Sequence, residues 1–178
     1  EGNSSNNEGK KSYVGDLIVI IFQIIKMQNL KILNSRETKE ILNLIEKQWG
    51  SKLKLDYAFL QNAKNRVFMV NKDISRINLE KLRINSVGMY FCEIDKIGIR
   101  LSIEGSQIAG KEATKNVVEI NDEQAKKWLR GEDLEIEGNY SGFVILKHDD
   151  FFLGTGRYKE SKVLNYVGKE RRITAISP

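Results

Sequence analysis

The sequence is poor in the residues that build covalent and metal-linked sites. Its 178 residues include one cysteine, Cys92, and one histidine, His148. One cysteine excludes an internal disulfide and any metal cluster built on cysteines. One histidine, with no carboxylate at a recognisable ligand spacing, leaves neither a zinc motif nor a Ser-His-Asp catalytic set. We therefore expect a protein without a metal, a cofactor or catalytic residues.

The local sequence around these two residues supports that interpretation. Cys92 lies in the aromatic-rich stretch 88–94, a predicted strand, which indicates a small buried thiol and not a nucleophile. His148 lies in a predicted hairpin turn, and we interpret it as a turn residue. An intracellular, reducing compartment, the cytoplasm, is compatible with both.

A long hydrophobic run is also lacking. The most apolar stretch, residues 17–25, spans nine residues, whereas a transmembrane helix needs about 20, so we expect no membrane partner. Lys10 and Lys11 precede this stretch, as in a secretory signal, but residues 25–28 offer no small-residue cleavage site. Met27 fits a native start. Residues 1–26 are therefore interpreted as a flexible or non-native extension, whose apolar part, if ordered, suggests an added strand or a packed apolar segment.

Charge is mild in total but unevenly placed. The net charge is +5, with 40% hydrophobic and 30% charged residues, which predicts a globular chain of one ordinary domain or two small ones. Residues 116–140 carry seven acids and three bases, whereas residues 156–172 carry six bases and two acids. If both segments are exposed, one side of the protein suits a polyanion. The alternative is a solvated surface of salt bridges.

Residues 27–114 show the pattern of an antiparallel sheet with helices. Asn34 and Glu37 form a predicted capping box, apolar residues then recur every three to four positions, and Gly50 ends the helix. Two hairpins are predicted, the first from strands at 52–60 and 66–70. The second has strands at 87–94 and 99–103 with a turn at 95–98, and a short helical connection is expected at 73–82.

Residues 104–112 match most positions of the phosphate-binding P-loop motif. Gly105, Gly110 and Lys111 have the required spacing after a strand, but the next residue is Glu112 where the pattern needs Ser or Thr to hold magnesium. Nucleotide hydrolysis at this loop stays open as one alternative. The other is a short helix and linker into the second half.

Residues 115–178 show an ordered series of small elements. A strand at 116–120 is followed by a helix capped by Asn121 or Asp122 and ended by Gly131. Trp128 on the inner face of this helix is interpreted as a core anchor, with a base-stacking platform as the alternative. A short strand at 134–136 precedes a hairpin with runs at 143–146 and 151–153, and Gly154-Thr155-Gly156 follow.

This order of features resembles that of PUA domains, small RNA-binding β pseudo-barrels. Residues 27–114 resemble the smaller domain that precedes the PUA domain in the Nip-seven family of ribosome-biogenesis proteins. Residues 166–172, Tyr-Val-Gly-Lys-Glu-Arg-Arg, resemble the PUA-type tails of Sun-family RNA cytosine-5 methyltransferases. The resemblance implies an α+β fold, with an N-terminal antiparallel sheet and helices followed by a C-terminal PUA-like β pseudo-barrel. It also implies binding of rRNA or tRNA, in ribosome biogenesis or RNA modification.

The expected RNA contacts come from charge and from the resemblance. Cations on one helix face and in the tail can contact several phosphates, and PUA domains hold RNA along the helix, the turn after it and the closing strand. The acidic stretch 132–135 departs from that pattern. The predicted RNA-binding residues are Lys126, Lys127, Arg130, Gly131, Glu132, Gly154, Thr155, Gly156, Arg157, Lys159, Lys162, Lys169, Arg171 and Arg172.

We predict a non-catalytic protein, because the catalytic cysteine and the glycine-rich cofactor loop of those methyltransferases belong to a separate domain and have no match here. One alternative is a protein-interaction adaptor for an RNA methyltransferase or a ribosome assembly factor. The other is an enzyme that uses the loop from Gly105 to Lys111.

Overall fold

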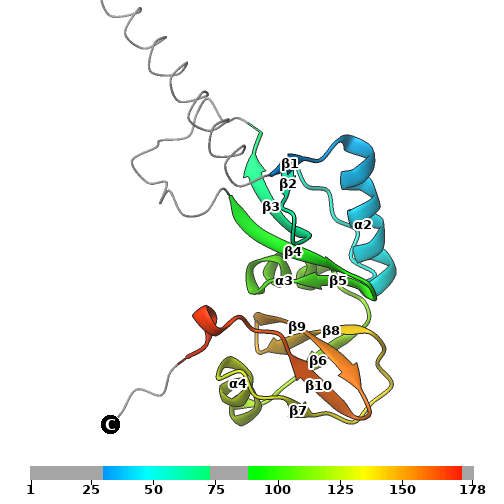
Figure 1. Cartoon of the computed structure of the whole chain (residues 1–178). Helices are drawn as coiled ribbons and strands as arrows, with labels where there is room; N and C mark the ends of the chain where they lie inside the picture. The colour runs from blue at the N-terminus through cyan, green and yellow to red at the C-terminus, as the bar shows by residue number, and fades with distance from the viewer. Residues whose placement is uncertain (1–29, 73–87, 174–178) are drawn as a thin grey trace, which may run out of the picture.

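The computed structural model describes residues 30–72 and 88–173, which form a mixed α/β fold with two five-stranded sheets (Figure 1). Sheet A, from the N-terminal part, lies above sheet B in this view, and helix α3 lies between them. The predictions for residues 1–26 and for the connection at 73–82 lie outside the described residues. None of the described helices is long and apolar enough to cross a membrane.

Helix α2 (Ser35–Trp49) begins and ends where its sequence signals predict. Asn34 and Glu37 form both hydrogen bonds of a capping box, at 3.0 Å each. Gly50 ends the helix with a left-handed φ of 74°, a conformation that glycine adopts without a steric penalty. The helix buries Ile41, Ile45 and Trp49 on one face, so its amphipathic pattern directly sets which side packs on the sheet.

Sheet A is an antiparallel meander in chain order. Both predicted hairpins form, but the strand expected from residue 52 starts only at Tyr57. Leu53 and Leu55 still pack against the core, so their alternation reflects burial without strand pairing. The strands are β1 (Lys31–Ile32), β2 (Tyr57–Gln61), β3 (Arg66–Asn71), β4 (Met89–Asp95) and β5 (Gly98–Leu101).

Helix α3 (Ile103–Ala109) and the 3₁₀ turn η3 (Gly110–Glu112) join the two halves. Ser102 caps α3 by accepting a 2.9 Å hydrogen bond from the Gly105 amide. The buried Ser106 hydroxyl accepts a hydrogen bond from the Gly154 amide at 2.9 Å, and Gln107 donates to the Phe152 carbonyl at 2.8 Å. These bonds fix sheet B to the end of sheet A.

Sheet B is curled into a half-barrel with the strand order β6-β8-β9-β10-β7. β6 pairs parallel to β8, and the other neighbours are antiparallel. The parallel pair has Val117 opposite Ile145, an arrangement that the local sequence pattern did not indicate. The strands are β6 (Val117–Glu119), β7 (Leu134–Glu135), β8 (Phe143–His148), β9 (Phe151–Lys159) and β10 (Lys162–Asn165).

The core has two parts, one on each face of sheet B. Phe143, Ile145 and Phe152 point from sheet B into the cluster that contains Trp49 and Phe91 of the N-terminal half. The opposite face packs on helix α4 (Asp122–Leu129) through a second cluster, which includes Trp128, Val144, Leu146 and Val163. The first cluster therefore belongs to both halves of the chain, and neither half has a complete core without the other.

Candidate RNA interface

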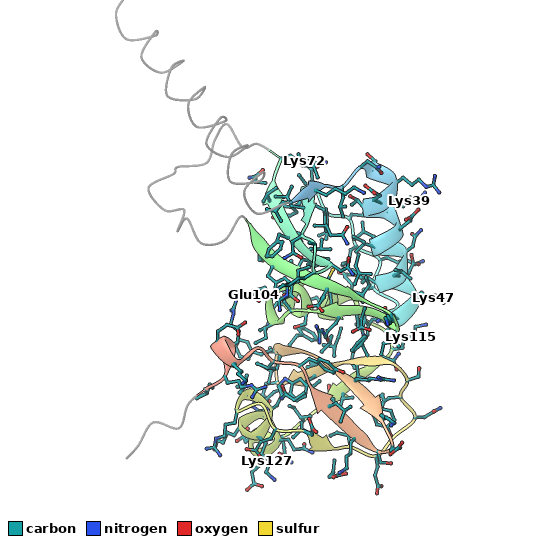
Figure 2. All side chains as sticks on the ribbon, in the orientation of Figure 1. Lys39, Lys47, Lys72, Glu104, Lys115 and Lys127 are labelled. Atoms are coloured by element: carbon teal, nitrogen blue, oxygen red, sulfur yellow. The ribbon has the colours of Figure 1, made fainter. Side chains whose placement is uncertain are left out.

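Helix α4 carries the predicted cations on its solvent side. Asn121 and Gln124 form its capping box, and the fully buried Trp128 donates a 2.7 Å hydrogen bond to the Leu153 carbonyl. Trp128 is thus a core anchor and not an exposed stacking platform. Figure 2 shows Lys127 at the lower edge of the molecule, pointing away from its body.

The turn after α4 places Arg172 beside the three cations of the helix, Lys126, Lys127 and Arg130. Gly131 has a φ of +90°, its amide bonds to the Trp128 carbonyl at 2.9 Å, and the Glu132 amide bonds to the Lys127 carbonyl at 3.1 Å. This is a Schellman ending, which needs a left-handed residue. A Cβ at Gly131 would lie 2.3 Å from Nε of Arg172, so the glycine makes room for that guanidinium.

The tail is held in this position by further bonds. The Ile173 amide donates to the Leu129 carbonyl at 2.9 Å, and Arg172 Nε donates to the Val167 carbonyl at 3.1 Å. Asn165 at the end of β10 bonds to the carbonyls of Trp128 and Glu132 at 2.7 and 3.0 Å. We call Lys126, Lys127, Arg130 and Arg172 the α4 cluster.

The α4 cluster is free of ion pairs within the described part of the chain. The side chains of Lys126, Lys127 and Arg130 are exposed, and no carboxylate among residues 30–72 and 88–173 forms a salt bridge with them or with Arg172. Lys169, on the 3₁₀ turn η4 (Lys169–Arg171), is also exposed. Cations without a carboxylate partner are available to a polyanion.

Replacing Gly131 by alanine is expected to lower the free energy of unfolding by about 1–2 kcal/mol, because the left-handed backbone is strained with a Cβ and Arg172 has to move. Gly142→Ala is the matched control, since Gly142 has a φ of +64° and a Cβ added there would meet no atom within 4 Å. Urea unfolding measures both variants. Equal losses would contradict a contact between Gly131 and Arg172.

Three of the other predicted cations are paired with carboxylates. Lys159 lies 3.2 Å from Glu160, and Lys162 lies 2.9 Å from Glu135 at the far end of β10. The hydrogen bond to Glu135 raises the pKa of Lys162. Arg171 pairs with Glu104 of α3 at 2.5 Å, so it binds the tail to the joint between the halves. The tail and closing strand thus do not present one continuous row of free cations.

Arg157 lies on the opposite face of sheet B from α4. Its register partner on β8 is Phe143, whose side chain belongs to the core shared with sheet A. Thr155, two residues earlier, bonds to the Leu101 carbonyl of sheet A, whereas Gly156 between them contacts Trp128. Because successive side chains of a strand alternate between faces, Arg157 points away from the α4 cluster.

Gly154, Thr155 and Gly156 are buried, which corrects their expected place on the contact surface. Thr155 is 3% exposed. A Cβ at Gly156 would meet Val163 and Trp128 within 2.3 and 2.6 Å. Close packing of Val163 and Trp128 against the strand therefore explains Gly156.

The glycines of the P-loop-like stretch also have packing roles. Gly105 lies inside helix α3, where a Cβ would be 2.1 Å from the Phe91 carbonyl oxygen, and Gly110 lies against the Phe152 ring. A phosphate-binding loop needs free backbone amides between a strand and a helix. Here the Gly105 amide is bonded to Ser102. This geometry favours the interpretation as a short helix and linker.

Cys92 has the buried position that its sequence context predicts, whereas the interpretation of His148 as a turn residue is wrong by one position. Cys92 is fully buried, and burial raises the pKa of its thiol well above the usual range. His148 is the last residue of β8, just before the turn at 149–150, and its Nδ1 lies 3.1 Å from the Ile120 carbonyl oxygen. Among the residues that the structure describes, no three His, Cys, Asp or Glu side chains gather to hold a metal ion.

Sequence reasoning missed a second set of cations, on sheet A. Arg66 and Arg100 both pair with Glu93, at 3.3 and 2.6 Å, and the Arg100 guanidinium lies 4.5 Å from the centroid of the Tyr166 ring. Burial and the Glu93 carboxylate raise the pKa of the neighbouring Tyr90 to about 12. The sequence could have indicated only that Arg66 and Arg100 point outward from β3 and β5. It could not indicate that they meet Glu93 and Tyr166, because these residues come together from distant parts of the chain.

Known proteins match different lengths of this chain. Residues 115–173 match the family described as the methyltransferase RsmF PUA domain. The ribosomal RNA small subunit methyltransferase F of Aeromonas salmonicida is 32% identical over 91 residues, which is 51% of this chain and 19% of that protein. That of Vibrio cholerae serotype O1 is 25% identical over 136 residues, 76% of this chain and 28% of that protein.

These alignments also include part of the N-terminal half, because they are longer than the 64 residues from position 115 to the C-terminus. The resemblance of residues 27–114 to the Nip-seven family stays a prediction. The chain spans about a fifth to a quarter of the length of the curated relatives that it matches. The Sun-family part of the resemblance is confirmed: residues 115–173 form a PUA domain homologous to that of RsmF-type methyltransferases.

Proposed function

We propose that this chain binds RNA through the α4 cluster, without catalysing a reaction itself, and that it serves rRNA or tRNA modification or ribosome biogenesis. The observation that carries the proposal is the group of unpaired cations on the outer face of α4 and at the turn after it, on a domain homologous to the PUA domain of RsmF. The named relatives are ribosomal RNA methyltransferases, which makes rRNA the first RNA to test.

The geometry supports contact with phosphates more than with base edges. Lys126 and Arg130 are four residues apart and share one side of α4, and Lys127 lies beside them. Arg172 extends the cluster across the Gly131 turn. Cations with no carboxylate partner release counterions from the nucleic acid when they bind phosphates, whereas paired cations first have to lose a carboxylate. Glu132 and Asp133 flank the cluster and limit its extent.

The test compares two triple variants that lose the same charge. Lys126→Gln, Lys127→Gln and Arg130→Gln are expected to weaken binding of a single-stranded RNA at least about 10-fold and to reduce the slope of log affinity against log salt by about 2, roughly 0.7 for each lost phosphate contact. The control carries Lys39→Gln, Lys47→Gln and Lys115→Gln, which Figure 2 shows on other parts of the surface. Fluorescence anisotropy over a salt series measures both.

For the unmodified chain, four phosphate contacts predict about a 50-fold loss of affinity between roughly 50 and 200 mM salt. Binding that resists salt, or that falls equally in both triple variants, would contradict an interface at the α4 cluster. If the chain instead bound an RNA methyltransferase or an assembly factor with no dependence on these charges, the adaptor function would replace this proposal.

A further inference from the structure

A pocket of about 110 Å³ lies where sheet A meets the tail after β10. Arg66, Tyr90 and Arg100 line it from sheet A, Tyr166 and Arg171 line it from the tail, and Glu104 of α3 lies at the junction. Figure 2 shows Glu104 at the level where the two halves meet. Both halves are therefore needed to build this pocket, which belongs to the PUA domain only in part.

The charges that line the pocket are balanced. Three arginines face three glutamates, Glu93, Glu104 and Glu170. Glu93 holds Arg66 and Arg100, and Glu104 holds Arg171. A phosphate entering the pocket would meet as many carboxylates as guanidinium groups, so the pocket does not select an anion. It does offer fixed hydrogen-bond donors and acceptors close together, which suits a neutral group with both on its edge.

An aromatic ring forms part of the wall. Tyr166 keeps 39% of its surface exposed, although it packs edge-on against the buried Phe143 ring at 6.0 Å and against the Arg100 guanidinium. These contacts restrict its movement. An exposed tyrosine ring that is held in one orientation is a stacking partner for another flat ring.

The volume limits the ligand. Pockets for drug-sized molecules and cofactors have volumes of about 300–1,000 Å³. This pocket, at about 110 Å³, is suited to a single ring system and not to a whole nucleotide cofactor.

The pocket lies next to the proposed phosphate-binding surface. Arg171 lines the pocket, whereas the following residue, Arg172, lies against Gly131 in the α4 cluster. Neighbouring Cα atoms are about 3.8 Å apart, so the α4 cluster and the pocket adjoin each other at this point of the tail.

We propose that this pocket takes one unpaired nucleobase of the RNA strand that the α4 cluster holds. The inference rests on the proposed RNA binding. The base stacks on Tyr166, and its edge exchanges hydrogen bonds with the Glu93 and Arg171 side chains, because every base carries donors or acceptors along its edge. The N-terminal half thereby contributes to RNA recognition, and binding favours exposed bases over duplex.

The experiment uses the full chain and two RNA strands of about 12 nucleotides, within the usual site size, one with uracil throughout and one abasic at all central positions. Tyr166→Leu keeps apolar volume against Phe143 but removes the flat ring. It is expected to lower affinity for the uracil strand about 5- to 50-fold, to leave the abasic strand nearly unaffected, and to keep the salt slope. Tyr166→Phe is expected to retain binding, and Tyr57→Leu, at a tyrosine 43% exposed on sheet A, is the control.

The outcomes separate the two proposals. If the unmodified chain binds the uracil strand but Tyr166→Leu binds it equally well, the base pocket is refuted and the α4 interface stands. If Tyr166→Leu lowers the affinity for the uracil strand and for the abasic strand to the same extent, stacking of a base on Tyr166 is refuted. If the unmodified chain binds neither strand at low salt, the proposed RNA binding fails, and the base pocket fails with it.

Discussion

In the Trp49→Ala variant, both halves of the protein are expected to unfold together, at a lower denaturant concentration than in the unmodified chain. Trp49 is fully buried, and its indole donates a 3.0 Å hydrogen bond to the Phe143 carbonyl of sheet B. Removing a buried tryptophan costs about 3–5 kcal/mol through lost burial and the cavity that remains. A domain of this size has about 5–15 kcal/mol of stability, so the change removes a large fraction of it.

The second tryptophan makes this measurement specific. The chain has two tryptophans, so in Trp49→Ala the fluorescence comes from Trp128, which lies in the other core cluster. We expect its urea transition to shift with the circular dichroism transition. Trp49→Phe retains most of the volume and is the reference, and Leu44→Ala, at a residue 38% exposed on the same helix, is the surface control. A Trp128 transition that does not move would mean that the halves unfold independently.

Gly105→Ala is expected to destabilise the joint between the sheets, although alanine normally strengthens a helix. In an exposed helix the change gains about 1 kcal/mol of helix propensity. Here the new Cβ would lie 2.1 Å from the backbone oxygen of Phe91 and 3.2 Å from its ring. The Phe91 carbonyl accepts a 3.0 Å hydrogen bond from the Ser102 amide, which a shift of this carbonyl would weaken. Overpacking of about 1–3 kcal/mol or more therefore outweighs the gain.

The same variant distinguishes the joint from a phosphate-binding loop. If residues 103–112 only connect the two sheets, Gly105→Ala lowers the urea midpoint of unfolding. Lys111→Ala then changes this midpoint less, because the Lys111 side chain is exposed. Titration calorimetry with magnesium-ATP is expected to give no heat with the unmodified chain. An unchanged or raised midpoint for Gly105→Ala, together with nucleotide binding, would favour the enzymatic alternative.

Local signals in the sequence predicted the helices and turns well because their physical causes are local. The capping boxes at Asn34 and Asn121 and the glycine endings at Gly50 and Gly131 depend on residues within about one helical turn. The β8–β9 hairpin forms around the turn at Asp149, as its polar residues predict. These elements also determined the order of parts that resembles a PUA domain.

The site was only partly predictable, because a sequence does not show toward which side of the fold a charged side chain points. The free cations of α4 were identified, since a helix face follows from spacing. The side of β9 on which Arg157 projects, and the pairing of Lys162 with Glu135, depend on strand register and on neighbours distant in the chain. Glycines were the least predictable, since close packing on Phe91 or Trp128 and contact with a ligand favour the same residue.

The sequence by itself determined the boundaries of α2 and α4 and a C-terminal module with cations on its helix. Only the tertiary structure decided that Gly154–Gly156 are interior, that the two halves share one core through Trp49, and that Arg66, Arg100 and Tyr166 meet in a pocket. The physical reason is range: caps and turns are set by adjacent residues, whereas burial, ion pairing and pockets arise when segments far apart in the chain pack together.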